Sequence, residues 1–394
     1  MPDVAVGQFI STEEIVSQEK VIDMDPKMRL LDPDQTQFVT MTSRSKSRPA
    51  LAEKVNWLEE QYINRIVTLT AAYTANGPSL TVSAADGNSV FKDDVLRNMR
   101  TGEAFLVTAS VGGVLTVNSA IAGSGPALPI NAAGNIGDKL LVVGDAQKQG
   151  ADFPDPRYSQ RINQFNYTQI TRTPWSFAGT TTAIELYGGR EPAKEAARKA
   201  VEHKRKLEAG GFFGARDFIT AAQDPQGLAG GLIEFIQTNR QSVGGELTSD
   251  FLDSFLATVL AKGSADKVIY TGTIGAYYIS RFNRSGQGAF WKPSNEKVHG
   301  VQVDGFISGV FGTLVPVVVK KEWADFPSGV GGYNGNLFVV DNSNVERRPL
   351  RDRDTKLLTQ RQGPGQDRVA AEYLTESSWE IAQEKTHGLL TGIA

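Results

Sequence analysis

The sequence predicts an α+β protein built from two or three packed units with extensions. Its 394 residues, 40% of them hydrophobic, are too many for one ordinary core. Short alternating apolar segments separated by glycine turns fill residues 78–147, which indicates a compact all-β unit. An alanine-rich helical pattern at 190–209 and a mixture of helix and strand patterns at 249–341 indicate a separate α/β unit.

The first 50 residues have few apolar residues, scattered between prolines and charges. Thr12 is suited to cap a short helix that runs to about Val21. Two interpretations stay open, a frayed terminus or an arm that becomes ordered on a neighbouring subunit. Both predict that the segment packs poorly by itself.

Extended segments flank the β unit on both sides. Arg65–Thr70 precedes it, and Phe165–Ile170 and Thr180–Tyr187 follow it. The pair Gly112-Gly113 predicts a hairpin turn inside it. We expect a long two-stranded arm with a β decoration at its tip, in which the predicted strands of the decoration are Leu80–Val82, Ala104–Thr108, Val114–Val117 and Lys139–Val143.

A long helix is predicted at 190–209, where Pro192 suits the first turn and Gly210-Gly211 the end. His203 falls among its charged residues, so we expect His203 to be exposed. The following unit alternates helix and strand, with predicted helices at 249–262 and 274–283 and predicted strands at 268–271, 298–307, 313–320, 336–341 and 369–382.

Residues with catalytic chemistry are scarce. There is no cysteine, and the three histidines, His203, His299 and His387, are far apart in the sequence. No phosphate loop, dinucleotide fingerprint or serine elbow occurs. Glu59 and Glu60 are expected to form a solvated face. We therefore predict no enzyme, and no catalytic, cofactor-binding or metal residues, although calcium or magnesium on carboxylates stays open.

The charge balance limits the possible partners. The formal net charge is −3, without a basic excess, so direct binding to DNA is expected to be weak and local. No run of 18 apolar residues occurs, and residues 1–25 lack a basic start and an apolar core. We expect neither a membrane span nor a secretory signal. We also expect that the chain is synthesised in a cytoplasm.

Arginine is concentrated between Glu346 and Arg368. These residues form a solvated loop balanced by nearby carboxylates, a salt-bridge surface between subunits, or a phosphate site. For each tryptophan, a role as a core anchor and a role as an interface anchor are equally consistent with the sequence. The candidate intersubunit interface consists of Trp57, Trp175, Arg347, Arg348, Arg351, Arg353 and Arg361.

The order of these elements resembles the Hong Kong 97 type of tailed-phage major capsid protein, in the branch with a β subdomain inserted in the extended loop. The resemblance covers about residues 50–394. It is carried by the strings Val55–Glu60, Phe165–Ile170, Tyr187-Gly188 ahead of Glu191 and Lys204–Glu208, Phe311–Leu314 ahead of Val317–Val319, Glu372–Glu376, Ala382 and His387-Gly388.

The resemblance implies a self-assembling subunit of an icosahedral shell that encloses double-stranded DNA. Its implied partners are copies of itself in pentamers and hexamers, with scaffolding, portal and decoration proteins as further possibilities. It implies assembly in the host cytoplasm and a final place in the virion. The implied regions are an N-terminal arm at 1–50, an extended loop at 51–187 with the β subdomain at 78–147, a peripheral domain at 188–225 and 366–382, and an axial domain at 226–365 and 383–394.

Three other classes compete with this interpretation. One of them, an enzyme with an uncharacterised carboxylate site, is supported by no motif in the sequence. A nanocompartment (encapsulin-like) shell shares the fold but usually has a compact loop, which the residues at 78–147 argue against. A tail or fibre protein built of β-domains is disfavoured by the alanine-rich helix at 190–209.

Overall fold

The protein is described by a computed structural model, which covers residues 36–44, 47–74, 77–118, 133–154, 156–184, 191–220, 224–284, 290–292, 297–298, 301–302, 304–307, 312, 314–327 and 331–394. The chain divides into two compact units. The smaller unit is Leu58–Ile162, and the larger unit contains the residues before and after it.

A mixed sheet lies at the centre of the larger unit. In the described part of the chain it has seven strands, and its inner strands β13, β18 and β19 combine parallel and antiparallel pairing. In spatial order the strands are β12 (Arg240–Gly245), β23 (Gly388–Ile393), β19 (Leu337–Asp341), β13 (Lys267–Thr271), β18 (Leu314–Val319), β17 (Asp304–Ile307) and β14 (Phe290–Lys292).

Both faces of this sheet are buried, so its inner strands are apolar at consecutive positions. In β13, Val268 and Tyr270 contribute to one core, whereas Ile269 between them contributes to the other. The second core is closed by α6 (Ser249–Leu260) and α7 (Thr273–Arg284), whose apolar residues recur at helical spacing. Thr248 caps α6 by accepting a hydrogen bond from the Phe251 N–H at 3.3 Å.

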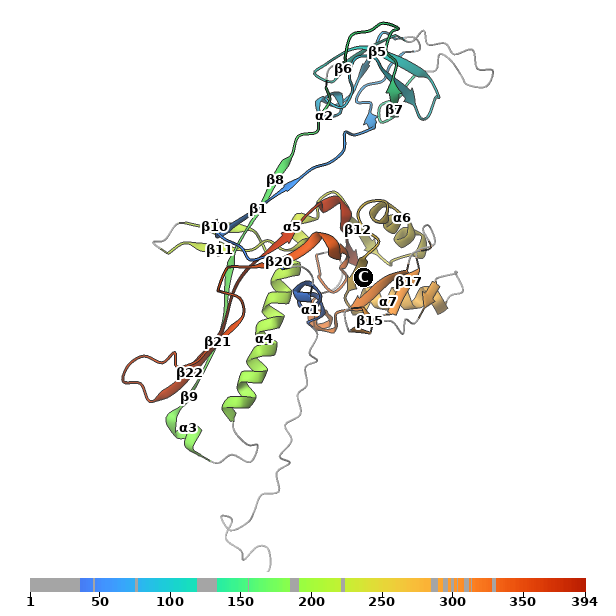
Figure 1. Ribbon diagram of the computed structural model, residues 1–394. Helices are drawn as coiled ribbons and strands as arrows, with labels where there is room; N and C mark the ends of the chain where they lie inside the picture. Colours follow the sequence, from blue (N-terminus) through green and yellow to red (C-terminus); the bar gives the residue numbers. More distant parts are fainter. Residues whose placement is uncertain are drawn as a thin grey trace, which may run out of the picture. The chain divides into compact units, whose positions relative to one another are not determined.

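A second sheet of the larger unit is built on β22 (Arg368–Ile381). It pairs on one side with β9 (Gln169–Ala178), and on the other with β20 (Val345–Pro349) and β21 (Lys356–Leu358). The long helix α4 (Glu191–Phe213) lies along β9 and β22 (Figure 1). Trp379 and Ile381 of β22 belong to the same hydrophobic core as residues of the central sheet and of α4. The helix α4 therefore packs against both sheets.

Glu208 of α4 is buried and connects three separate segments. Its carboxylate accepts hydrogen bonds from the backbone N–H groups of Phe38, at 3.0 Å, and Val39, at 2.9 Å, in the first turn of α1 (Gln37–Arg44). It also forms an ion pair with Lys320, which follows β18 and is equally buried. Burial lowers the pKa of Lys320, and the negative charge of Glu208 opposes that shift.

The smaller unit has its own core around a twisted antiparallel sheet. The hairpin from β5 to β6 turns at Gly112 and Gly113, which both adopt positive φ angles. The described strands, in spatial order, are β2 (Ile66–Thr68), β7 (Lys139–Asp145), β4 (Asp94–Asn98), β5 (Ala104–Val111), β6 (Val114–Asn118) and β3 (Ser79–Thr81). One helical turn, α2 (Ala84–Gly87), accompanies them.

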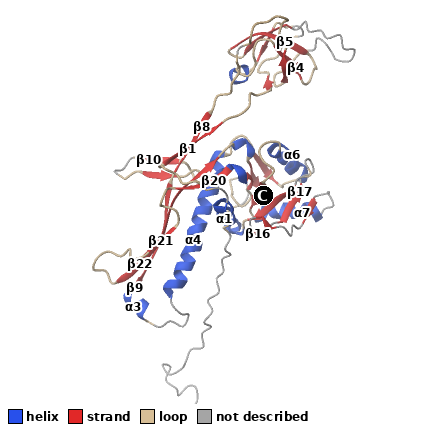
Figure 2. Cartoon of the chain, in the orientation of Figure 1, coloured by secondary structure: helices blue, strands red, loops and turns tan. Residues whose placement is uncertain are grey.

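A two-stranded ribbon of β1 (Lys54–Glu59) and β8 (Ile162–Tyr167) is formed where the chain enters and leaves the smaller unit (Figure 2). The remaining short elements are β10 (Asp217–Ile219), β11 (Gln226–Leu228), β15 (Lys297–Val298), β16 (Val301–Gln302), α3 (Gly179–Ala183), α5 (Leu232–Phe235), and the 3₁₀ turns η1 (Lys321–Asp325), η2 (Asn342–Asn344) and η3 (Glu384–Thr386).

Two sequence predictions need correction where α1 and α4 meet. Residues 37–44 were expected to pack poorly, but Phe38 and Met41 are buried in the core against α4. The predicted stop at Gly210-Gly211 is wrong, because α4 continues to Phe213. Gly211 is required there by close packing, since a Cβ would lie 2.6 Å from the Phe38 ring.

Two predicted strands also differ from the structure. Thr180–Tyr187 was expected to be extended, yet residues 179–183 form α3, and 185–187 lie outside the described residues. The single strand predicted at 298–307 is divided among β15, β16 and β17. The helix predicted at Thr12–Val21 also lies outside the described residues.

We predict that Glu208→Gln lowers the free energy of unfolding of the unassembled chain by about 3 kcal/mol, because it leaves the buried ammonium of Lys320 without a counter-charge. The matched control is Glu202→Gln on the same helix, whose side chain pairs with Lys199 near the surface. It should cost about 0.5 kcal/mol or less. Urea unfolding followed by circular dichroism measures both, and equal losses would contradict the role of Glu208.

Candidate assembly interface

The two faces of β22 have different chemistry. Odd-numbered side chains point to the core side, where Trp379 meets Phe38 at a ring-centroid distance of 5.2 Å and Thr375 hydrogen-bonds to His203 of α4. Even-numbered side chains point the opposite way, and Glu372, Glu376 and Glu380 recur there at every fourth position. A row of carboxylates on one face of a strand requires compensating positive charge.

That charge comes from arginines on the neighbouring strands. Glu372 pairs with Arg172 of β9 at 2.7 Å and with Arg361 at 2.9 Å. Glu376 pairs with Arg353, and Glu380 pairs with Arg348 of β20.

Arg48 extends the row at its β20 end. Its guanidinium lies 3.5 Å from Glu380 and 3.3 Å from Glu346, which is opposite Glu380 in the register of β20 and β22. Without this cation two like charges would face each other across the ladder. We call the whole set the arginine layer, and its members are Arg48, Arg172, Arg348, Arg353 and Arg361 with Glu346, Glu372, Glu376 and Glu380.

The predicted interface arginines thus fall into three groups. Arg348, Arg353 and Arg361 belong to the arginine layer. Arg347 is buried on the opposite face, where its guanidinium donates to the exposed Asp354 at 2.7 Å, and this charge helps to lower the pKa of the Asp354 carboxyl. Arg351 is exposed, and no ion pair of its side chain is found in the described part of the chain.

The two predicted tryptophans lie in different places. Trp57 of β1 is buried with Ala50 and Val55, and its ring lies 5.8 Å from that of Phe235. Trp175 of β9 is partly exposed and lies 5.3 Å from the ring of Tyr373 on β22. Trp57 therefore acts as a core anchor within the subunit, whereas Trp175, on the same face of the sheet as Thr173, is only partly buried.

His203 was expected to be exposed, which is wrong. The imidazole is 1% exposed between α4 and the sheet, where its Nδ1 lies 3.0 Å from Thr173 Oγ1 and its Nε2 lies 2.7 Å from Thr375 Oγ1. A neutral imidazole has one N–H donor and one acceptor nitrogen, so both ring nitrogens are satisfied by these two hydroxyl groups. Burial lowers the pKa of His203 to about 4, and the charges of Lys206 and Arg347 contribute.

One further polar expectation is wrong, and two histidines remain to be placed. Glu59 was expected to be solvated with Glu60, but Glu59 is buried and only Glu60 is exposed. His387 is buried beside β23 and accepts the N–H of Asp341, at 3.1 Å, through Nδ1. His299 lies outside the described residues.

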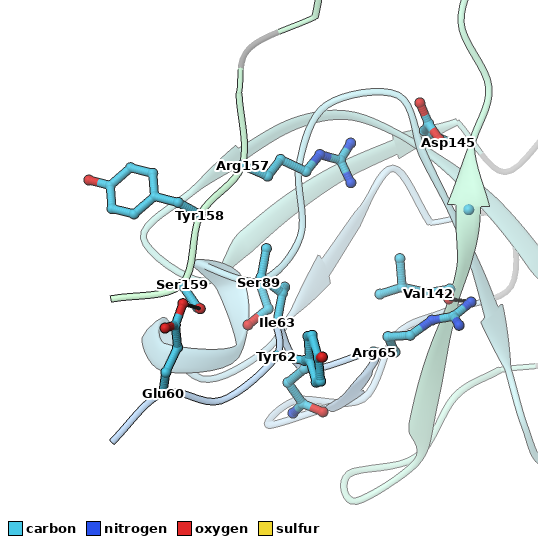
Figure 3. A pocket seen from close by; sticks show the side chains of 12 residues that line it. Glu60, Tyr62, Ile63, Arg65, Ser89, Val142, Asp145, Arg157, Tyr158 and Ser159 are labelled. Atoms are coloured by element: carbon cyan, nitrogen blue, oxygen red, sulfur yellow. Dashed lines mark hydrogen bonds between the residues drawn. The ribbon is translucent and has the colours of Figure 1, made fainter. Parts of the chain in front are cut away.

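The smaller unit has an open hollow of about 680 Å³ (Figure 3). Its two arginines have partners within the same unit. Arg157 pairs with the buried Asp94 at 2.8 Å, and Arg65 donates to the carbonyls of Val142 and Val143. Tyr62 and Tyr158 line the hollow and are exposed. These residues show no arrangement of nucleophile and base, so the hollow does not indicate catalysis.

Two structural searches cover only the described residues. Among them no cluster of three or more His, Asp or Glu side chains is placed to hold a metal ion. No helix in those parts of the chain is long and apolar enough to cross a membrane.

Comparison with known proteins identifies the class to which this chain belongs. Residues 8–394 match the SU10 major capsid protein family, so the chain belongs to that family. It is therefore a phage major capsid protein, and its place is the capsid of the virion. A curated relative, the major capsid protein of Pseudomonas phage PaMx41, is 24% identical over 366 residues, which are 90% of this chain and 84% of the relative.

The solved structures to which this chain is similar include two capsids and an encapsulin. The capsid of the native GTA particle gives a TM-score of 0.49 at 10% identity, covering 97% of this chain and 98% of the other. The capsid of Myoviridae phage XM1 gives 0.49 at 12% identity, covering 96% and 98%. The SrpI encapsulin of Synechococcus elongatus PCC 7942 gives 0.43 at 10% identity, covering 60% and 78%. At these TM-scores, the assignment rests on the family match.

We predict that the unassembled chain loses stability as the pH falls from about 6.5 to about 4. In this window the unfolded chain binds a proton at His203, whereas the folded chain, with its lowered pKa, does not. Protonation therefore favours unfolding, by on the order of 1–3 kcal/mol. Chemical unfolding at several pH values measures this effect. Burial also lowers the pKa of His387 to about 4, so His387 contributes in the same window. His203→Gln should therefore reduce the pH dependence by about half, and an unchanged slope in that variant would contradict the assignment to His203.

Proposed function

We propose that this capsid protein has the Hong Kong 97 type of fold and forms pentamers and hexamers in an icosahedral shell. The shell encloses the double-stranded DNA of a tailed phage and is assembled in the host cytoplasm. Scaffolding, portal and decoration proteins are further candidate partners. The family match supports the shell, and the order of ribbon, long helix and central α/β unit supports the fold.

The proposed regions are those that the resemblance implies. Residues 1–50 are the N-terminal arm, and 51–187 are the extended loop with the β subdomain at 78–147. Residues 188–225 and 366–382 are the peripheral domain, and 226–365 and 383–394 are the axial domain. The separate core of Leu58–Ile162 and the packing of α4 on β9 and β22 support this division.

The ribbon of β1 and β8 is the observation that carries the assembly proposal. It is two-stranded, and a two-stranded ribbon is only marginally stable in water. Leu58 of β1 is 66% exposed and Ile162 of β8 is 51% exposed. Such strands gain stability when a neighbour covers their apolar side chains and unpaired edges. We therefore assign the outer side of the ribbon to a contact with the next subunit.

The candidate intersubunit residues keep this role as part of the proposal. Arg351 is exposed, and Trp175 is only partly buried, so both are able to contact a neighbour. Arg348, Arg353 and Arg361 are able to do so while they remain paired with the glutamates of β22, because a guanidinium offers more donors than one carboxylate uses.

We predict that the chain expressed alone forms closed shells, tubes, or rings of five or six subunits, and that Leu58→Glu with Ile162→Glu abolishes them. Both side chains are already exposed, so the free energy of unfolding should change by about 0.5 kcal/mol or less. Val111→Glu, at an exposed position of the β5–β6 hairpin, is the control and should still assemble. Negative-stain electron microscopy and light scattering after size exclusion measure the products.

A stable trimeric rod from the unmodified chain would contradict the proposal in favour of a fibre protein. Shells that contain a cargo enzyme in place of DNA would indicate a nanocompartment. Normal assembly of the Leu58→Glu, Ile162→Glu variant would show that the ribbon is not a contact.

A further inference from the structure

The arginine layer presents positive charge outward. Its carboxylates are between 3% and 18% exposed, whereas Arg48, Arg172, Arg353 and Arg361 are between 44% and 64% exposed. The glutamates therefore lie beneath the guanidinium groups. An approaching partner meets the arginines first, and at short range the surface attracts anions.

The positive charge of this face exceeds what the subunit neutralises. The layer contains five arginines and four glutamates. Arg368 lies on the same face of β22 by alternation and is exposed, and Arg351 is exposed just after β20. Neither has an ion-pair partner among the residues that the structure describes. A carboxylate from outside the subunit is able to bind these groups without displacing an existing pair.

An apolar side chain interrupts the arginines. Ile170 of β9 lies opposite Glu376 in the register of β9 and β22, so it is on the arginine face, and it is 53% exposed. A partner for this face therefore has acidic residues interspersed with aliphatic ones.

The sequence contains one segment with that composition, residues 1–35. It has eight acidic and three basic residues, a net charge of −5, whereas the whole chain has a net charge of −3. Its acidic residues alternate with aliphatic pairs, such as Glu13-Glu14 followed by Ile15-Val16. The acidic excess of the chain is thus concentrated in its first 35 residues.

The segment joins the fold on the side of the sheet opposite to the arginine layer. Residue 36 precedes α1, and Phe38 of α1 contacts Trp379, which is on the core face of β22. Arg48, four residues after the end of α1, already reaches the layer of the same subunit. A segment of 35 residues is long enough to reach its own layer or that of a neighbour, and the mixed variants described below distinguish the two.

We propose that the acidic segment 1–35 of one subunit binds the arginine layer of a neighbouring copy. This contact rests on the proposed assembly and names the surface that the N-terminal arm uses. Each carboxylate–guanidinium pair at such a surface is weak and screened by salt, but several pairs along one segment, repeated over a closed shell, add up. Because the contact is largely electrostatic, it also orients adjacent subunits relative to each other without requiring a large apolar interface.

Disulfide trapping tests the contact, since the chain has no cysteine of its own. Ser17→Cys places a thiol in the acidic segment, and Ile170→Cys places one on the arginine face. The two single variants are mixed before assembly and then oxidised, so that only contacts between copies give a cross-linked dimer. The control mixture pairs Ser17→Cys with Tyr277→Cys, an exposed position on α7.

We expect the dimer from the Ile170→Cys mixture to exceed that of the control by at least about five-fold. Neutralising the segment with Glu13→Gln, Glu14→Gln and Glu19→Gln should bring it down to the control level. Equal trapping at both positions, or trapping unaffected by neutralisation, would overturn the contact. A double variant that carries both Ser17→Cys and Ile170→Cys is oxidised in parallel. If only this variant forms the disulfide, and only within one chain, the contact between copies is also overturned.

Light scattering on the same samples separates the two hypotheses. If particles assemble but no cross-link forms, the contact between the acidic segment and the arginine layer is rejected, whereas the proposed assembly into a shell is retained. Absence of any oligomer from the unmodified chain counts against the proposed function, and the contact fails with it.

Discussion

The buried carboxylate of Glu208 is the interaction on which the larger unit depends. It combines the N–H groups of α1, the ammonium of Lys320 and its own helix α4 in one place that water does not reach. A buried charge of this kind adds little net stability, but the loss of any partner is costly, so it fixes one arrangement of the three segments. The apolar core around Phe38, Phe212 and Tyr270 then packs on that arrangement.

The second organising feature is the difference in chemistry between the two faces of β22. The core face carries Trp379 and the buried His203–Thr375 contact, and it holds α4 in position. The other face is polar, and its carboxylates are satisfied by arginines from several strands. A single strand therefore contributes both to the interior of the subunit and to a charged outer surface. This arrangement suits a protein whose function is to be a part of a larger structure.

Much of the fold was predictable from local patterns. The apolar spacing of 249–262, the glycine pair at 112–113 and the alanine-rich run after Pro192 each correspond to an element of the structure. The failures concern residues whose role depends on distant partners. Gly211 looks like a helix stop, but Phe38, far away in the sequence, requires a glycine there. His203 looks exposed among charged neighbours until Thr173 and Thr375 enclose it.

The arginine cluster illustrates the same limit for the candidate site. The sequence predicts that Arg348, Arg353 and Arg361 are candidates for salt bridges, but it does not show that their partners are the glutamates of β22. Glu372, Glu376 and Glu380 share one face because side chains alternate along a strand. That face is defined only when the bounds of the strand are known. Arg347, one residue away from Arg348, points to the other face and is buried. A contiguous cluster in the sequence is thus divided by the strand into two different environments.

The most direct test of the central claim, that the subunit is completed only by its neighbours, is a cryo-electron microscopy reconstruction of the assembled particle. The account predicts that Leu58 and Ile162 are covered by an adjacent subunit and that density from another copy lies on the arginine layer. A particle in which the β1–β8 ribbon and the outer face of β22 both remain open to solvent would contradict it.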